Sequence, residues 1–124
     1  AKLTHGIRAI LWHQGESDSI PELAPAYAAK LHDLVSRLRE LVKVPDAPFI
    51  AGQMGKFSDM PWTAEKALVD QVHQDLPKNV PNSAFVSAEG LKHKGDKIHF
   101  DSASFRELGK RYAAAYLKMA SMVK

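Results

Sequence analysis

The sequence predicts an α/β fold with a parallel sheet and helices on its faces. Short apolar segments alternate with longer segments in which apolar residues recur at helical spacing, in the order strand, helix, three times over. Right-handed crossovers then make the strands parallel. The 124 residues fit one domain, and 45% hydrophobic with 25% charged residues is the balance of a folded protein rather than a disordered one.

The first strand is expected at residues 7–12, where the apolar residues are nearly continuous and Arg8 is the only charge. A long amphipathic helix is expected next, over residues 21–41. Its apolar residues fall at helical spacing: Tyr27, Leu31, Leu34, Val35, Leu38 and Leu41. Pro45 and Pro48 end this helix and lead into the second strand, at residues 49–53.

The second half of the chain repeats the pattern. A helix is expected over residues 64–76, closed by Pro77, with one apolar side made of Ala67, Leu68, Val72 and Leu76. The third strand is expected at residues 84–86. The last helix covers residues 102–122, with Asp101, Ser102 and Ser104 as capping candidates and a capping box between Ser104 and Glu107.

The composition excludes several classes of function. Without cysteine, the chain has no disulfide, no thiolate nucleophile and no cysteine zinc site. The net charge is only +3 and its basic residues are scattered, which does not indicate a nucleic-acid partner. Apolar runs such as residues 9–12 and 113–117 are far too short to span a membrane. We expect a soluble protein, and the compartment stays open, secreted or periplasmic locations included.

Residues capable of chemistry follow each expected strand. In open α/β sheets, ligands bind just beyond the carboxyl ends of the strands, so these residues are expected on one rim. They are His13, Gln14, Gly15, Glu16, Ser17 and Asp18 after the first strand, Gln53, Met54, Gly55, Lys56 and Ser58 after the second, and Glu89, His93, Asp96 and His99 after the third.

Asp96 and His99 are the most informative pair on this rim. A carboxylate three residues before a histidine can accept from one ring nitrogen and leave the other free as a general base. The alternative is structural: Asp96 forms a local turn, and His99 is a packed or surface histidine. A second alternative takes His93, Asp96 and His99 as metal ligands, although no ligand pair sits on a helix face as in zinc motifs.

The segment from Gln14 to Ser17 is the second constellation. Gly15 allows a sharp turn, the Gln14 amide can donate to an oxyanion, and Glu16 can hold or polarise the histidine. Alternatively, this is a polar turn in which Ser17 or Asp18 caps a helix. Ser17 lacks the second glycine of the Gly-x-Ser-x-Gly turn, which argues against a nucleophile elbow.

Four segments together resemble the SGNH (GDSL-like) hydrolases, most closely the carbohydrate acetylesterases of the acetylxylan esterase and sialate O-acetylesterase type. These are residues 12–18, 48–50, 96–100 and 107–113. The resemblance implies a flavodoxin-like three-layer sandwich, of which this chain supplies a βαβαβα portion. It also implies that His99 is the catalytic base, Asp96 its orienting acid, Gln14 an oxyanion donor and Glu16 a second acid.

The same resemblance implies serine-type removal of acetyl groups from sugars such as acetylated xylan, without a metal or organic cofactor. Trp62 is then a candidate apolar face for a sugar ring, or a residue that packs at a helix start. The family's nucleophilic serine would precede residue 1. Residues 1–124 are thus interpreted as the carboxyl-terminal part of one SGNH domain.

Two expectations follow for the chain by itself. It should bind its own amino-terminal half or self-associate through the edge at residues 7–12, and it should lack esterase activity. The competing hypothesis is a non-catalytic sugar-binding or interaction module derived from such an esterase.

Overall fold

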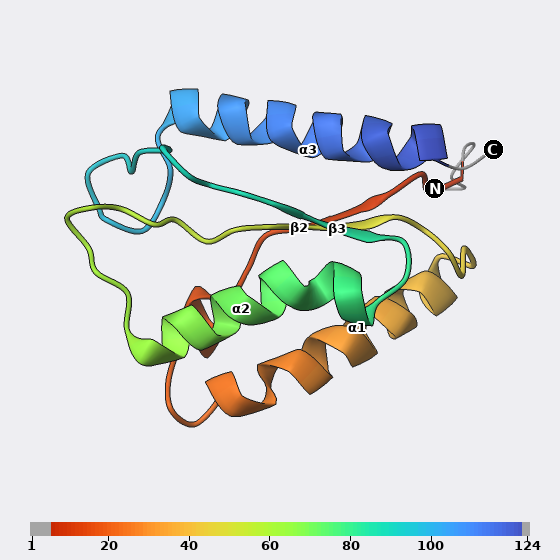
Figure 1. Cartoon of the computed structure of the whole chain (residues 1–124), viewed down its shortest axis with the longest axis horizontal. Coiled ribbons are helices and arrows are strands. Elements are labelled where there is room, and N and C mark those ends of the chain that lie inside the picture. Colours follow the sequence, from red (N-terminus) through yellow and green to blue (C-terminus); the bar gives the residue numbers. More distant parts are fainter. Residues whose placement is uncertain (1–5, 123–124) are drawn as a thin grey trace.

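The computed structural model describes residues 6–122 and has three layers (Figure 1). The middle layer is a parallel sheet in the order β1 (Ile10–Trp12), β2 (Phe49–Gly52) and β3 (Ser83–Val86). The helices α1 (Tyr27–Leu41) and α2 (Ala64–Asn79) lie on one face, and α3 (Ser102–Met122) covers the other. The predicted α/β class with a parallel sheet is confirmed.

The strands are shorter or shifted relative to the expectation. In the register of the sheet, Ile10 pairs with Phe49, and Phe49 with Ser83. The first strand begins at Ile10 rather than at residue 7, while the third begins one residue earlier than expected. Gln53 lies just beyond β2, although its backbone N–H still donates to the Val86 carbonyl at 2.8 Å.

Helix α2 continues through Pro77, so the expectation that this proline closes the helix is wrong. Proline removes one N–H from the last turn. The flanking residues complete that turn: the Val80 N–H bonds to the Leu76 carbonyl at 2.9 Å, and the Asn79 side chain donates to the Asp75 carbonyl at 3.1 Å.

The buried side of α2 also differs from the expected one. It consists of Val69, Asp70, His73 and Leu76, whereas Leu68 is 45% exposed. Asp70 and His73 are polar residues on the buried side. The apolar spacing therefore predicted that a neighbouring face of the helix, which includes Leu68, is buried.

Of the expected capping candidates for α3, Asp101 is confirmed, whereas the expected capping box between Ser104 and Glu107 does not form. The Asp101 carboxylate accepts from the Ser104 N–H at 2.7 Å, as an N-cap does. The Ser104 hydroxyl instead accepts from the Lys92 N–H at 2.8 Å. This contact ties the start of α3 to the loop after β3, and Glu107 pairs with Arg111 at 3.3 Å.

Each face of the sheet has its own apolar core. The first packs α1 and α2 against Phe49 and Ala51, and the second packs α3 against Ile50 through Leu108 and Tyr112. Beside the edge strand β1 an apolar groove of about 530 Å³ runs along α3, and Leu11 in this groove is 58% exposed. Over residues 6–122, no helix is both long and apolar enough to cross a membrane.

Candidate active site

The loops after β1 and β3 share a pocket of about 320 Å³ at the carboxyl-terminal rim of the sheet. It is lined by His13, Glu16, Ser17, Ile98, His99, Phe100 and Phe105. The His13 ring lies 5.6 Å from the Phe100 ring, and its Nε2 is 3.0 Å from the Gln53 carbonyl oxygen. Residues about 80 positions apart in the sequence thus meet here, as the rule for open α/β sheets predicts.

His99, which lines this pocket, forms a close pair with Asp96. The Nδ1 of His99 lies 2.6 Å from Asp96 Oδ2, and Asp96 Oδ1 accepts from the N–H groups of Ile98 and His99. The hydrogen bond with the ring and these two backbone bonds hold the pKa of Asp96 well below its usual range. A carboxylate that stays ionised favours the Nδ1–H tautomer of His99 and leaves Nε2 as the basic nitrogen.

Both interpretations of this pair therefore coexist in the structure. Asp96 does form a local turn, and the same carboxylate also orients a histidine whose side chain is 62% exposed. A turn alone needs only the backbone contacts, so the ring contact is the additional feature. The catalytic role of the pair stays a prediction.

A short hairpin presents the pair. The Asp101 N–H donates to the Lys92 carbonyl, the Lys94 N–H donates to the His99 carbonyl, both at 2.9 Å, and His93 lies opposite Phe100. We refer to residues 92–101 as the His99 hairpin. Its tip contains Gly95 and Lys97 with positive φ angles of 118° and 62°.

Glu16 lies in the same pocket, in a 3₁₀ turn that spans Glu16–Asp18. The turn begins at Gly15, whose φ of 156° disfavours other residues. A Cβ on Gly15 would lie 2.8 Å from Met54 Sδ and 3.0 Å from Val69 Cγ1. Gly15 is therefore needed both for its backbone angle and for its close approach to α2.

Gln14 is oriented away from this pocket and is not among the residues that line it. Its amide nitrogen donates to Asp18, and its amide oxygen accepts from the Tyr27 hydroxyl at 3.0 Å. Both ends of the side chain thus have partners on the α1 side of the sheet. An oxyanion role requires the amide to rotate out of these contacts.

Trp62 does not line the pocket either. Its indole N–H donates to the Gly55 carbonyl at 3.0 Å, and its ring packs at the edge of the first core. The ammonium groups of Lys56 and Lys66 lie 4.9 and 5.7 Å from the ring centre. These contacts fit the alternative of a packing residue near the start of α2, and the sugar-binding role stays a prediction.

A buried polar cluster lies beneath Gly15, and the spacing of residues in the sequence did not predict it. His73 Nε2 lies 2.8 Å from the Tyr27 hydroxyl, and Asp70 accepts from Gln53 at 3.3 Å. Burial lowers the pKa of His73 to about 4 and raises that of Tyr27 to about 12, so both are neutral near pH 7. The available signal was the pair of polar residues, Asp70 and His73, one turn apart among apolar residues of α2.

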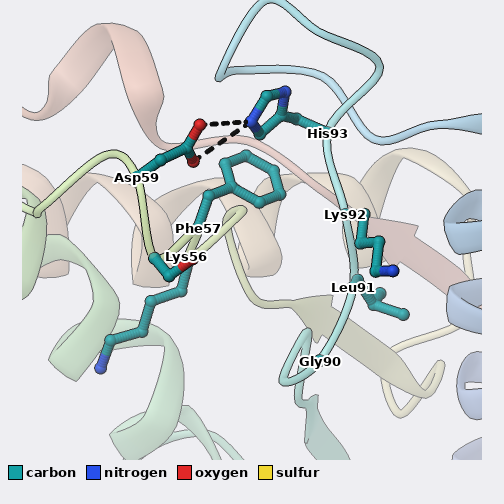
Figure 2. Close-up of a pocket in the computed structure, with 8 residues that line it drawn as sticks. Lys56, Phe57, Asp59, Gly90, Leu91, Lys92 and His93 are labelled. Carbon is teal, nitrogen blue, oxygen red and sulfur yellow. Dashed lines mark hydrogen bonds and ion pairs between the residues drawn. The ribbon is translucent and has the colours of Figure 1, made fainter.

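A second histidine–aspartate pair bridges two loops at the mouth of a larger pocket (Figure 2). His93 Nε2 lies 3.0 and 3.1 Å from the two carboxylate oxygens of Asp59. His93 therefore turns toward Asp59 and not toward Asp96 and His99. No group of three or more histidine, aspartate and glutamate side chains able to hold a metal ion occurs within residues 6–122.

Comparison with known proteins places the chain in a family. A family model described as "SASA: Carbohydrate esterase, sialic acid-specific acetylesterase" matches residues 1–118. The chain belongs to this family of carbohydrate esterases. The predicted resemblance to carbohydrate acetylesterases is thereby confirmed at the level of the family.

Relatives of this SASA-family chain include a probable carbohydrate esterase of Arabidopsis thaliana. The two are 30% identical over 113 residues, which cover 90% of this chain and 40% of the plant protein. The X-ray structure of an Arabidopsis thaliana protein matches 90% of the chain and 44% of its own length with a TM-score of 0.78 and 28% identity. The chain thus spans less than half of the relatives' length.

A second solved structure supports the fold alone. A carbohydrate acetylesterase from Xanthomonas citri matches with a TM-score of 0.65 at 17% identity. The match covers 83% of this chain and 23% of that protein.

Proposed function

We propose that the protein containing this chain is a serine-type carbohydrate O-acetylesterase in which His99 is the general base. The observation that carries the proposal is the 2.6 Å contact between His99 Nδ1 and Asp96 Oδ2 at a pocket shared with Glu16. An imidazole held at Nδ1 by an ionised carboxylate has the tautomer and orientation that a hydrolytic base needs.

In the proposed reaction, His99 Nε2 takes the proton from a serine hydroxyl, and the serine oxygen attacks the acetyl carbonyl. The bond between the acetyl carbon and the sugar oxygen then breaks, and His99 returns the proton to the departing sugar hydroxyl. Water attacks the acetyl-enzyme by the same route and releases acetate. Glu16 acts near the imidazolium as a second acid, and Gln14 donates to the oxyanion after its amide leaves Asp18.

The nucleophilic serine is proposed to lie in a segment that precedes residue 1 in the complete protein. Support comes from the chain's coverage of only 40% of the plant relative and from the exposed apolar groove beside β1. We propose that this preceding segment pairs with β1 and covers Leu11. The acyl group is proposed to be acetyl and the sugar to belong to a polysaccharide such as acetylated xylan.

The test uses the complete reading frame that contains this chain, assayed for acetate release from p-nitrophenyl acetate and acetylated xylooligosaccharides. His99→Ala and Asp96→Asn should each lower kcat by about 10⁴-fold, because one removes the base and the other disturbs its tautomer. His32→Ala on α1 and Asp75→Asn on α2 are matched controls and should keep wild-type rates. Wild-type turnover by His99→Ala would refute the assignment.

Two further results test the esterase assignment against the non-catalytic alternative and test the role of Gln14. Binding of the acetylated sugar without any acetate release by the wild-type protein would favour a sugar-binding module. Gln14→Ala should lower kcat by about 100- to 1000-fold with little change in KM. An unchanged kcat would remove Gln14 from the site.

A further inference from the structure

Two side chains of the His99 hairpin contact the neighbouring loop: Phe100 packs on Phe57, and His93 binds Asp59. Asp59 lies in the loop between β2 and α2, 34 residues earlier, and both of its carboxylate oxygens are within 3.1 Å of His93 Nε2 (Figure 2). Of the two side chains, His93 is only 20% exposed and Asp59 is 50% exposed. The contact therefore joins a partly buried residue of the hairpin to an exposed residue of the neighbouring loop.

The hydrogen bonds of His93 determine which ring nitrogen carries the proton. Its Nδ1 accepts from the Gly95 N–H at 2.9 Å and must be unprotonated, so the proton is on Nε2 and points at Asp59. His99 has the opposite arrangement, because its Nδ1 faces Asp96. The hairpin thus holds two histidines in opposite tautomers.

These bonds form a continuous series from the neighbouring loop to the proposed base. Asp59 holds His93, His93 holds the backbone of Gly95, Gly95 directly precedes Asp96, and Asp96 holds His99. The rings of His93 and Phe57 also pack edge to face with their centroids 4.9 Å apart, and the Phe57 ring packs on the Phe100 ring at a centroid distance of 5.7 Å.

The hairpin tip depends on this series, because the tip residues from Lys94 to His99 are all exposed. The base of the hairpin has its own attachment to α3, through the Lys92 N–H and the Ser104 hydroxyl. The buried Phe100 anchors the hairpin on the side that follows His99. His93 connects the loop that carries Asp59 to the backbone of Gly95, on the side that precedes Asp96.

We propose that Asp59 and His93 are positioning residues for the esterase reaction, which fix the His99 hairpin so that Asp96 and His99 keep their geometry. This inference rests on the proposed function for its kinetic consequence, but its structural consequence is independent. Neither residue touches the reacting atoms in this assignment. Displacement of a catalytic group by about 1 Å can cost about 100-fold in rate, so an attachment of this kind has a measurable effect.

Matched variants separate the two bonds of His93 in the full-length protein. His93→Asn keeps an acceptor where Nδ1 lies and cannot reach Asp59, whereas His93→Gln places an amide N–H nearer Asp59 and gives up the bond to Gly95. Asp59→Asn keeps an oxygen that accepts from Nε2–H, and Asp59→Ala does not. Asp75→Ala, which removes a carboxylate paired with Lys78 on α2, is the control.

We expect His93→Asn, His93→Gln and Asp59→Ala to lower kcat by about 10- to 100-fold with KM changed less than about threefold. Asp59→Asn should retain most of the wild-type kcat, and Asp75→Ala should retain all of it. Equal kcat in wild type, His93→Asn and Asp59→Ala would overturn the inference. So would an equal loss in Asp59→Asn and Asp59→Ala, since the first preserves the acceptor.

Nitrogen-15 NMR of the imidazoles gives a readout that needs no activity. In the wild-type protein His93 should be the Nε2–H tautomer and His99 the Nδ1–H tautomer. His93→Asn should weaken or broaden the His99 Nδ1–H signal. A variant that is only less stable, but still folded, should keep this signal. An unchanged His99 signal in that variant would overturn the inference even if the protein proved not to be an esterase.

Discussion

Gly15→Ala tests whether the turn before Glu16 is as constrained as the structure indicates. The added methyl group would lie 2.8 Å from Met54 Sδ, 3.0 Å from Val69 Cγ1 and 3.1 Å from His73 Cε1. Met54, Val69 and His73 are all fully buried, so none can move into solvent. Gly15 also has a φ of 156°, a backbone angle that is strained for any residue with a Cβ.

Two costs contribute to the expected loss of stability. Overpacking a closed core costs about 1–3 kcal/mol. A residue held in a sparsely populated backbone region costs about 1–3 kcal/mol more. We therefore expect Gly15→Ala to lower the free energy of unfolding by about 3 kcal/mol, or Tm by roughly 10 °C for a chain of this size.

The measurement is urea unfolding followed by circular dichroism, with Gly109→Ala as the matched control. A Cβ on Gly109, inside α3, would meet nothing within 4 Å, so this variant should be more stable by about 0.5–1 kcal/mol. The double variant Gly15→Ala/Val69→Ala should relieve only the contact with Val69, because the closer contact with Met54 Sδ and the backbone strain both remain. A Gly15→Ala protein within about 0.5 kcal/mol of wild type would refute both the packing and the strain arguments.

Three further outcomes are expected from the described contacts. Burial lowers the pKa of His73 to about 4, whereas the same histidine in the unfolded chain takes up a proton near pH 6.5. The free energy of unfolding should therefore fall by about 3 kcal/mol when the pH is lowered from 6.5 to 4. His73→Gln should flatten this slope in urea unfolding measured across that range, and an unaltered slope would assign the effect elsewhere. Tyr112→Phe leaves the Trp12 carbonyl without the hydroxyl that now donates to it at 2.6 Å, so calorimetry should show a loss of about 1–2 kcal/mol that Tyr116→Phe on the same helix does not share. Asp101→Ala removes the cap of α3 and should cost about 1 kcal/mol in thermal unfolding, whereas equal stability would show that the start of α3 is held by other contacts.

Elements with an uninterrupted local pattern could be predicted from the sequence. The spacing from Tyr27 to Leu38 and the continuous apolar residues of β2 are local signals, and the structure contains both elements. The Asp96–His99 contact belongs to the same class, because three residues of turn suffice to bring the carboxylate to the ring.

Predictions went wrong where a partner from another element decides the outcome. Asp101 is confirmed as a cap, but the predicted box between Ser104 and Glu107 is wrong, because the Ser104 hydroxyl accepts from the Lys92 N–H in a neighbouring loop. The apolar side of α2 was misassigned because His73 is buried against Tyr27, 46 residues away. No spacing rule within α2 encodes that contact.

The proposed active site also combines a local contact with a contact between distant segments, and the two should respond differently to mutation. The geometry of His99 depends first on Asp96, a local partner, and then on Asp59, whose link to the hairpin spans 34 residues. A local pair survives small movements of the elements around it, whereas the Asp59–His93 contact exists only when β2 and β3 deliver their loops to the same place. On the proposed function, changes that loosen the sheet should therefore reduce kcat through the hairpin before they unfold the protein.

Val86→Ala is such a change, because Val86 is 5% exposed, pairs with Gly52 at the end of β3 and directly precedes the loop to the hairpin. A kcat that stays at the wild-type value in Val86→Ala, at a temperature where the variant remains folded, would show that the hairpin is held by its local contacts alone.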